Sequence, residues 1–335
     1  MTKDTTVEAP VRTLPPYTPA WKQCVLIAVL ATAAYFIFPN YLALLSRIAI
    51  LSILVVSLDL VVGYAGLATL GHVAFYGIGA YAAANMAIQV TGNPFLGLLA
   101  GAAAGGLAAG LSGLVILRYQ GFAFLMLTVA IAQVLQSICG KLTRLTGGDD
   151  GLSGFKVAPV FGFPFDMQGR VAYIYSAAGL LLCYLIAKRV VDSPFGLSVL
   201  GIGQCRVRMY ALGTSVTLQL WKMYLIAGAL AGFAGALSAQ TNGIVGLDSL
   251  SFELSAEILV MLVIGGAGRL WGALVGTTIF LVLHHTASSI DPYNWLFVIG
   301  GMLMLVVMVP GNTLSRLTST LQKVFSRRAN ASSAN

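Results

Sequence analysis

The stretch GYAGLATLGHVAFYGIGAY, residues 63–81, decides the fold class. It holds no Asp, Glu, Lys or Arg, and it lies in a region long enough to enter a bilayer, for which about 20 apolar residues suffice. Glycines recur through it, with Tyr64, His72 and Tyr76 between them. Glycine at this density lets helices pack closely or break, and a broken helix is tolerated in a membrane only beside protein or a water-lined path. The stretch therefore indicates either tight helix packing or a transport pathway.

The composition of the whole chain supports many membrane spans. Of its 335 residues, 58% are hydrophobic and 9% are charged, whereas soluble domains carry roughly 25% charged residues. The deficit extends along the whole chain, so we expect an all-α, polytopic integral membrane protein with about ten (roughly eight to ten) transmembrane segments. The net charge of +8 does not indicate a nucleic-acid partner, because the basic residues lie in short segments between apolar runs.

The expected spans fill a transmembrane domain over residues 21–310, between polar tails at 1–20 and 311–335. The glycine-rich segments at 66–90 and 255–289 are the ones where a broken or re-entrant helix is the alternative to a continuous span. Apolar segments are predicted at 22–38, 41–62, 66–90, 94–117, 121–138, 171–187, 216–241, 255–268, 270–289 and 293–309.

Basic residues set the predicted orientation. Lys3, Arg12 and Lys22 lie in or just after the N-terminal tail, segment 188–222 carries five basic residues against one acid, and the C-terminal tail carries basic residues and no acid. All three are therefore expected to face the cytoplasm. This requires an even number of crossings before residue 188 and after residue 222, and the predicted segments supply six and four. The polar interruption at 139–170 is then expected to face outward.

No catalytic or metal-binding arrangement is legible in the sequence. It has no GxxxxGK[ST] loop, so ATP hydrolysis is not expected in this chain. The pair His284-His285 lacks an i, i+4 partner and indicates an interfacial role. We predict that the chain is not an enzyme and holds no metal or cofactor. Small buried hydrophobes are expected at the four widely separated cysteines, Cys24, Cys139, Cys183 and Cys205.

Two acids lie in or beside apolar segments, where charge is costly and often functional. Asp59 precedes one glycine cluster and Glu257 precedes another, and each is expected to face a polar cavity or to bond to a broken helix. His72 is expected either to line a path or to make one structural hydrogen bond. The predicted translocation path comprises Asp59, Gly63, Tyr64, Gly66, His72, Glu257, Gly265, Gly266 and Gly268.

The two glycine clusters also share a motif. LVVGYAGL at 60–67 resembles LVIGGAGRL at 262–270. Internal repeats build many transporters around a central site, although a chain rich in Gly and Ala also produces such matches by chance. Both explanations stay open on the sequence alone.

The segment SPFGLSVLGIGQCRVRMYALG, residues 193–213, is the second strong signal. It is cytoplasmic by the charge argument, and Pro194, Gly196 and Gly213 punctuate it. It predicts a short helix along the membrane surface. Such a helix either touches anionic lipid or docks onto a motor protein.

Four motifs, in order over about residues 41–312, resemble the permease family of branched-chain amino acid ABC importers, LivM type. Residues 63–81 are similar to its GYAG-x-x-SLGH-x-AFFGIGAY stretch, and TGGDDGL at 146–152 to its outer TGG-x-(N/D)-GL loop. SPFG at 193–196 with ALG at 211–213 resembles the ends of its cytoplasmic coupling segment. SAEILVMLVIGGAGRLWGALVG at 255–276 resembles its late glycine-rich stretch.

The resemblance implies a bacterial inner-membrane permease subunit with both termini in the cytoplasm. Its implied partners are a second homologous permease, two cytoplasmic ATPases that use ATP and Mg, a periplasmic substrate-binding protein and membrane lipid. The binding protein is expected at Gly147, Gly148, Asp149, Asp150 and Gly151. ATPase coupling is expected at Pro194, Phe195, Gly196, Gln204, Arg206, Arg208, Ala211, Leu212 and Gly213. The substrate would be a branched-chain amino acid or a related small polar compound or organic acid.

The coupling segment departs from the family pattern in one respect. The family places acids and amides in its middle, in a pattern like RAIRENExAAxALG, whereas this chain has Gly203, Gln204, Cys205 and Arg206, with Arg208 following. We therefore predict a partner ATPase whose docking groove is more acidic. The alternative function is a self-contained secondary transporter or channel, which explains the spans but not the docking segment.

Overall fold

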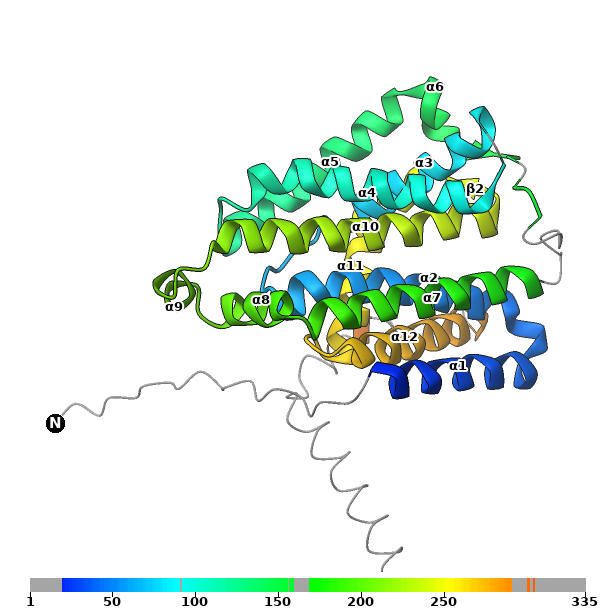
Figure 1. Cartoon of the computed structure of the whole chain (residues 1–335). Coiled ribbons are helices and arrows are strands. Elements are labelled where there is room, and N and C mark those ends of the chain that lie inside the picture. The colour runs from blue at the N-terminus through cyan, green and yellow to red at the C-terminus, as the bar shows by residue number, and fades with distance from the viewer. Residues whose placement is uncertain are drawn as a thin grey trace, which may run out of the picture.

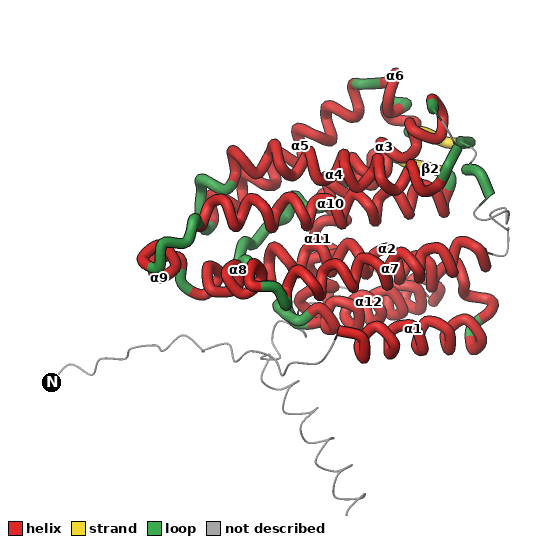
Figure 2. The backbone as a smooth tube through the Cα atoms, viewed as in Figure 1, coloured by secondary structure: helices red, strands yellow, loops and turns green. Residues whose placement is uncertain are grey.

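The computed structural model describes residues 20–90, 92–155, 157–159 and 169–290, together with residues 300, 301 and 304. In this part of the chain the fold is all-α, as expected, and Figure 2 shows helices almost throughout with a single small strand pair. The C-terminal tail, the first 19 residues and most of the segment expected at 293–309 lie outside the described residues.

The long helices are α1 (Ala20–Ile37), α2 (Leu42–Asp59), α3 (Val73–Gln89), α4 (Pro94–Ile116), α5 (Phe122–Lys141), α7 (Arg170–Val191), α10 (Val216–Asn242), α11 (Phe252–Gly265) and α12 (Leu270–Ile290). The shorter ones are α6 (Thr143–Thr146), α8 (Pro194–Gln204) and α9 (Arg206–Ala211). A π-helical turn η2 (Leu60–Tyr64) extends α2, and 3-10 turns lie at η1 (Pro39–Tyr41), η3 (Gly148–Asp150) and η4 (Leu247–Leu250). Strands β1 (Leu152–Ser153) and β2 (Ile244–Val245) pair antiparallel.

Each of the nine segments expected before residue 290 contains a helix, but fewer of them are full spans than predicted. Among the described residues, six helices are long and apolar enough to cross a membrane: Pro39–Tyr64, Pro94–Ile116, Phe122–Lys141, Arg170–Val191, Val216–Asn242 and Leu270–Ser289. The expected 66–90 span is shortened because residues 65–72 are not helical. Helix α11 has 14 residues, as many as the segment expected at 255–268, but it begins and ends three residues earlier and is too short to count as a full span. Helix α5 runs to Lys141, three residues beyond its expected end.

The helices form two groups that run side by side (Figure 1). Helices α3, α4 and α10 pack closely against one another, and α2 packs against α7 and α12. Small residues set the spacing in the first group, because a Cβ atom at Gly105 would lie 2.7 Å from the Cα atom of Gly232. Such stripes let helix backbones approach closely in a membrane. Helix α2 also contacts α10, which joins the two groups.

The connecting segments gather at the two ends of these groups. Figure 1 shows α8 and α9 at one end, and α6 with β2 at the opposite end. Six long helices, α1 to α5 and α7, precede the segment at 193–213, and among the described residues four of them are long and apolar enough to span a membrane. The six crossings expected before residue 188 stay a prediction. The segment at 193–213 and the loop at 147–151 lie at opposite ends of the helical body (Figure 1), and their assignment to the two faces of the membrane stays a prediction.

Candidate functional site

The first helix break follows α2. The α-helical ladder of α2 gives way at Leu60 to a π-helical turn, and residues 65–72 are not helical before α3 begins at Val73. Single π turns within helices are rare and frequent at functional sites. Gly66 has a φ of 68°, a backbone conformation that favours glycine. The glycine-rich stretch is thus a helix end followed by a non-helical segment, and only its C-terminal part is a helix.

The second break lies between α11 and α12. Helix α11 ends at Gly265, and Gly266 and Gly268 have φ values of 85° and 84°. The chain then turns back, and the backbone of Gly272 in α12 touches that of Gly265. With 14 residues, α11 reaches only about 21 Å. The segment at 255–289 is therefore a helical hairpin with a shortened first arm, as the alternative in the sequence analysis anticipated.

The two breaks meet, although about 200 residues separate them in the sequence. Asp59 Oδ1 accepts a hydrogen bond of 2.6 Å from the Gly268 backbone N–H. A Cβ atom at Gly63 would overlap that same nitrogen and lie 2.8 Å from the Gly268 Cα atom. Asp59 is fully buried. The two copies of the LV-x-G-x-AG motif therefore lie in direct contact, and Asp59 bonds to the broken helix, one of the two roles expected for it.

The coupling segment reaches the same place. A Cβ atom at Gly203, near the end of α8, would lie 2.6 Å from the carbonyl oxygen of Tyr64, and one at Gly66 would lie 3.2 Å from the Gly203 Cα atom. Backbone thus packs against backbone, with no side chain to absorb a displacement. We call Asp59, Gly63, Gly66, Gly203 and Gly268 the glycine junction.

Helix α8 is firmly held against the body of the protein. Ser193 caps its first turn by accepting from the Gly196 N–H at 3.2 Å, and Pro194 follows at the first helical position, where a missing N–H costs nothing. Val199 and Ile202 are buried, and a side chain at Gly196 would collide with the backbone at the end of α7. Phe195 is partly buried against the same core.

Helix α9 is the opposite case, because none of its residues is buried. Val207 and Tyr210 are 78% and 55% exposed, and Leu212, just after the helix, is 71% exposed. Arg208, Gln204 and Ala211 are exposed beside them, Arg206 is half-buried, and Gly213 ends the segment with a φ of 78°. An exposed surface that mixes apolar and basic side chains fits contact with another protein or with anionic lipid.

His72 lies beside the first break and is buried. A hydrogen bond of 2.9 Å joins its Nε2 to Ser57 Oγ in α2, and its ring meets the edge of Phe75. The Ser57 hydroxyl also bonds to the Leu54 carbonyl at 2.7 Å. His72 thus makes the structural hydrogen bond that was one of its two expected roles, and it does not line the cavity described next.

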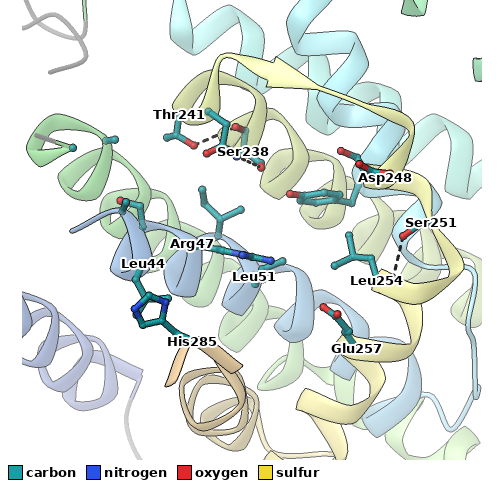
Figure 3. A pocket seen from close by; sticks show the side chains of 18 of the residues that line it. Leu44, Arg47, Leu51, Ser238, Thr241, Asp248, Ser251, Leu254, Glu257 and His285 are labelled. Carbon is teal, nitrogen blue, oxygen red and sulfur yellow. Dashed lines mark hydrogen bonds between the residues drawn. The ribbon is translucent and has the colours of Figure 1, made fainter. Parts of the chain in front are cut away.

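A cavity of about 910 Å³ lies between the two helix groups, toward the end that carries β2 (Figure 3). Of the nine predicted path residues, Glu257 is the one that lines it; the others named above lie at or near the two breaks. The sequence analysis missed Arg47, a charged residue inside the apolar segment 41–62, which is the signal that would have identified it. Besides Arg47 and Glu257, the lining of the cavity includes Leu44, Ser46, Ile50, Leu51, Tyr76, Ser238, Thr241, Asn242, Asp248, Ser251, Glu253, Leu254 and His285.

The loop at 147–151 lies at the same end as the cavity. Gly147, Gly148 and Gly151 all have positive φ values, and the Gly151 backbone packs against Gly246, next to β2. This tight turn leaves the Asp149 and Asp150 side chains exposed. The described part of the chain holds no group of three or more His, Cys, Asp or Glu residues able to bind a metal ion.

Comparison with known proteins agrees with this arrangement. Residues 40–307 match the family model described as branched-chain amino acid transport system / permease component. The high-affinity branched-chain amino acid transport system permease protein LivM of Salmonella typhimurium is 28% identical over 309 residues, which is 84% of this chain and 71% of that protein. The LivM protein of Escherichia coli is 28% identical over 289 residues, covering 78% and 67%.

A more distant relative is the galactose/methyl galactoside import permease protein MglC of Haemophilus influenzae, 27% identical over 143 residues, or 40% of this chain and 41% of that protein. No solved structure matches the chain significantly. The family match spans both helix breaks, the coupling segment and the cavity. The chain therefore belongs to the family of permease components of branched-chain amino acid transport systems.

Proposed function

We propose that this permease component forms the translocation path of an ABC importer and couples it to a separate ATPase through α8 and α9. The single observation that carries the proposal is the glycine junction, where Gly203 of α8 packs on the backbone of the first helix break. A push on α8 has no flexible side chain to deform there. It is passed directly to the end of α2 and, through the bond of Asp59 to Gly268, to the turn between α11 and α12.

Helices α2 and α11 both extend from the glycine junction to the cavity. Helix α2 carries Asp59 at the junction and Arg47 in the cavity wall, and α11 ends beside the junction and carries Glu257 in the wall. Helices move as rigid units, so a displacement at one end alters the spacing at the other. Movements of the partner ATPase against α8 and α9, driven by its binding and release of ATP, would thereby open and close the cavity, which is alternating access.

The proposed coupling from α8 and α9 to the cavity also implies an orientation in the membrane and a set of partner proteins. The end with α8 and α9 faces the cytoplasm of a bacterial inner membrane, where both termini also lie, and meets one of two ATPases that use ATP and Mg. The loop with Asp149 and Asp150 faces a periplasmic substrate-binding protein. A second, homologous permease completes the pore. The transported compound is a branched-chain amino acid, which the names of the LivM relatives support, or a related small polar compound or organic acid.

Reconstitution in liposomes tests the proposal against the alternative of a self-contained transporter. We expect uptake only when the ATPase subunits, the binding protein and ATP are all present. Uptake by this chain alone, driven by an ion gradient, would contradict the proposal.

The same liposomes test the basic docking surface. Reversing both charges with Arg206→Glu and Arg208→Glu should reduce ATP-driven uptake at least tenfold, because buried or close charge pairs at an interface contribute about 2–5 kcal/mol when one partner is lost. The matched control is Arg118→Glu, an exposed arginine just after α4, which should keep wild-type uptake. Unchanged coupling in the double variant would exclude an acidic groove on the ATPase.

A further inference from the structure

The cavity combines opposite charges with apolar walls at a depth where charge is expensive. Arg47 follows Pro39, the start of its span, by about 12 Å along the helix. A charged side chain at this depth normally faces a water-filled cavity or a partner, and it commonly marks a substrate pathway. Figure 3 shows the Arg47 side chain extending into the cavity from α2.

An acid faces the same space from a different helix. Glu257 of α11 lines the same cavity as Arg47 of α2 (Figure 3). Yet among the described residues Arg47 forms no ion pair within 4.0 Å. The two groups thus face one cavity from different helices and are not joined to each other. Two further acids of the cavity lining, Asp248 and Glu253, are exposed and add negative charge nearer the rim of the cavity.

Apolar side chains complete the wall between these charges. Leu44, Ile50 and Leu51 come from α2, and Leu254 comes from α11 one turn before Glu257. A planar guanidinium binds a carboxylate with two parallel hydrogen bonds, and a carboxylate accepts bonds from an ammonium group. A ligand that carries both charges and an apolar group would satisfy all three features. A dianionic acid would meet repulsion from the acids, and a neutral amide would leave Arg47 unmatched.

We propose that this cavity is a transient binding site for the zwitterion of an α-amino acid with an apolar side chain, whose carboxylate binds Arg47 and whose ammonium group binds Glu257. The inference rests on the proposed transport function and adds a site within the membrane domain, with the two residues that bind the charges of the substrate. The chain itself then contributes to selectivity, in addition to any binding protein.

Three probes that differ by one charge test this site on the full chain in nanodiscs, without a binding protein. Saturation-transfer NMR detects weak binding of L-leucine, of L-leucinamide, which lacks the carboxylate, and of 4-methylpentanoate, which lacks the ammonium group. We expect the wild type to bind L-leucine most tightly. Arg47→Ala should weaken binding of L-leucine and 4-methylpentanoate roughly tenfold or more, and leave L-leucinamide little changed. Glu257→Gln should weaken L-leucine and L-leucinamide and leave 4-methylpentanoate little changed.

Two further variants separate binding from folding. Arg47→Lys keeps a positive charge and should restore part of the L-leucine binding, whereas the control Arg118→Ala should bind all three probes like the wild type. The proposal is overturned if the wild type binds L-leucine no better than the two analogues, or if Arg47→Ala and Glu257→Gln both keep wild-type affinity. If the binding measurements give that result but ATP-dependent uptake in liposomes is still observed, the proposed transport function holds and only the proposed binding site is excluded.

Discussion

Gly63→Val should abolish ATP-driven uptake and lower the stability of the folded protein. Any Cβ atom at residue 63 would overlap the Gly268 nitrogen and lie 2.8 Å from its Cα atom. These two Gly268 atoms are backbone and cannot rotate away, and the Cβ atom would also displace the Asp59 carboxylate that bonds to Gly268. Overpacking typically costs about 1–3 kcal/mol, and we expect the upper end here because the turn between α11 and α12 must move as a whole. Thermal unfolding monitored by gel filtration gives the stability, and liposome uptake gives the activity.

A helical glycine with free space provides the control for this change. A Cβ atom at Gly140 of α5 would lie 3.6 Å from Leu247 Cδ1, which is ordinary van der Waals contact. Gly140→Ala should therefore leave uptake intact and stabilise α5 slightly, by about 0.5–1 kcal/mol. If Gly63→Val and Gly140→Ala had the same uptake and the same stability, the close approach of the two helix breaks would not be required for transport.

Asp59→Ala should uncouple ATP hydrolysis from uptake. The substitution removes the acceptor of the 2.6 Å hydrogen bond and leaves the Gly268 N–H without it, in a buried site. A hydrogen bond to a charged group contributes about 1.5–3 kcal/mol. The hydrolysis of ATP in the partner subunit should continue, while the number of substrate molecules moved per ATP falls at least tenfold. Asp59→Asn retains an oxygen acceptor and should be intermediate.

A second aspartate, Asp192, provides a comparison for the loss of stability expected in Asp59→Ala. Asp192 pairs with Lys188 at 3.1 Å near the end of α7, and the two side chains are 30% and 13% exposed. Ion pairs that water still reaches contribute only about 0–1 kcal/mol. Asp192→Ala should thus destabilise the protein far less than Asp59→Ala. A normal transport ratio in Asp59→Ala would show that the junction does not carry the coupling.

Hydropathy was enough to predict where the long helices lie, but not how many are full spans: six of the described helices are long and apolar enough, against the eight to ten expected. An apolar segment predicts the position of a helix because the backbone inside a bilayer must form its hydrogen bonds within the segment. The positions of the breaks were also predictable, since glycine recurs at 63–66 and 265–268. What the sequence left open was their function: it allowed packing or a path for the glycines, and a cavity or a broken helix for Asp59 and Glu257. The structure assigns a broken helix to Asp59 and a cavity to Glu257.

The contacts between distant segments were beyond sequence reasoning. The bond between Asp59 and Gly268 depends on how α2 packs against the α11–α12 hairpin, and no local pattern encodes that geometry. The cavity likewise draws on five or more elements, with polar residues such as Ser238 that look unremarkable in α10. Arg47 is different, because a single arginine within an apolar run is a visible signal.

The most direct test of the account is the accessibility of Cys205, which lies between α8 and α9 and is partly exposed. A membrane-impermeant thiol reagent should leave Cys205 unmodified in intact cells and modify it in inside-out vesicles, more slowly when the partner ATPase is bound. A cysteine placed at the opposite end by Asp150→Cys should show the reverse pattern. Modification of Cys205 from outside intact cells would place the coupling segment on the wrong side of the membrane and contradict the importer account.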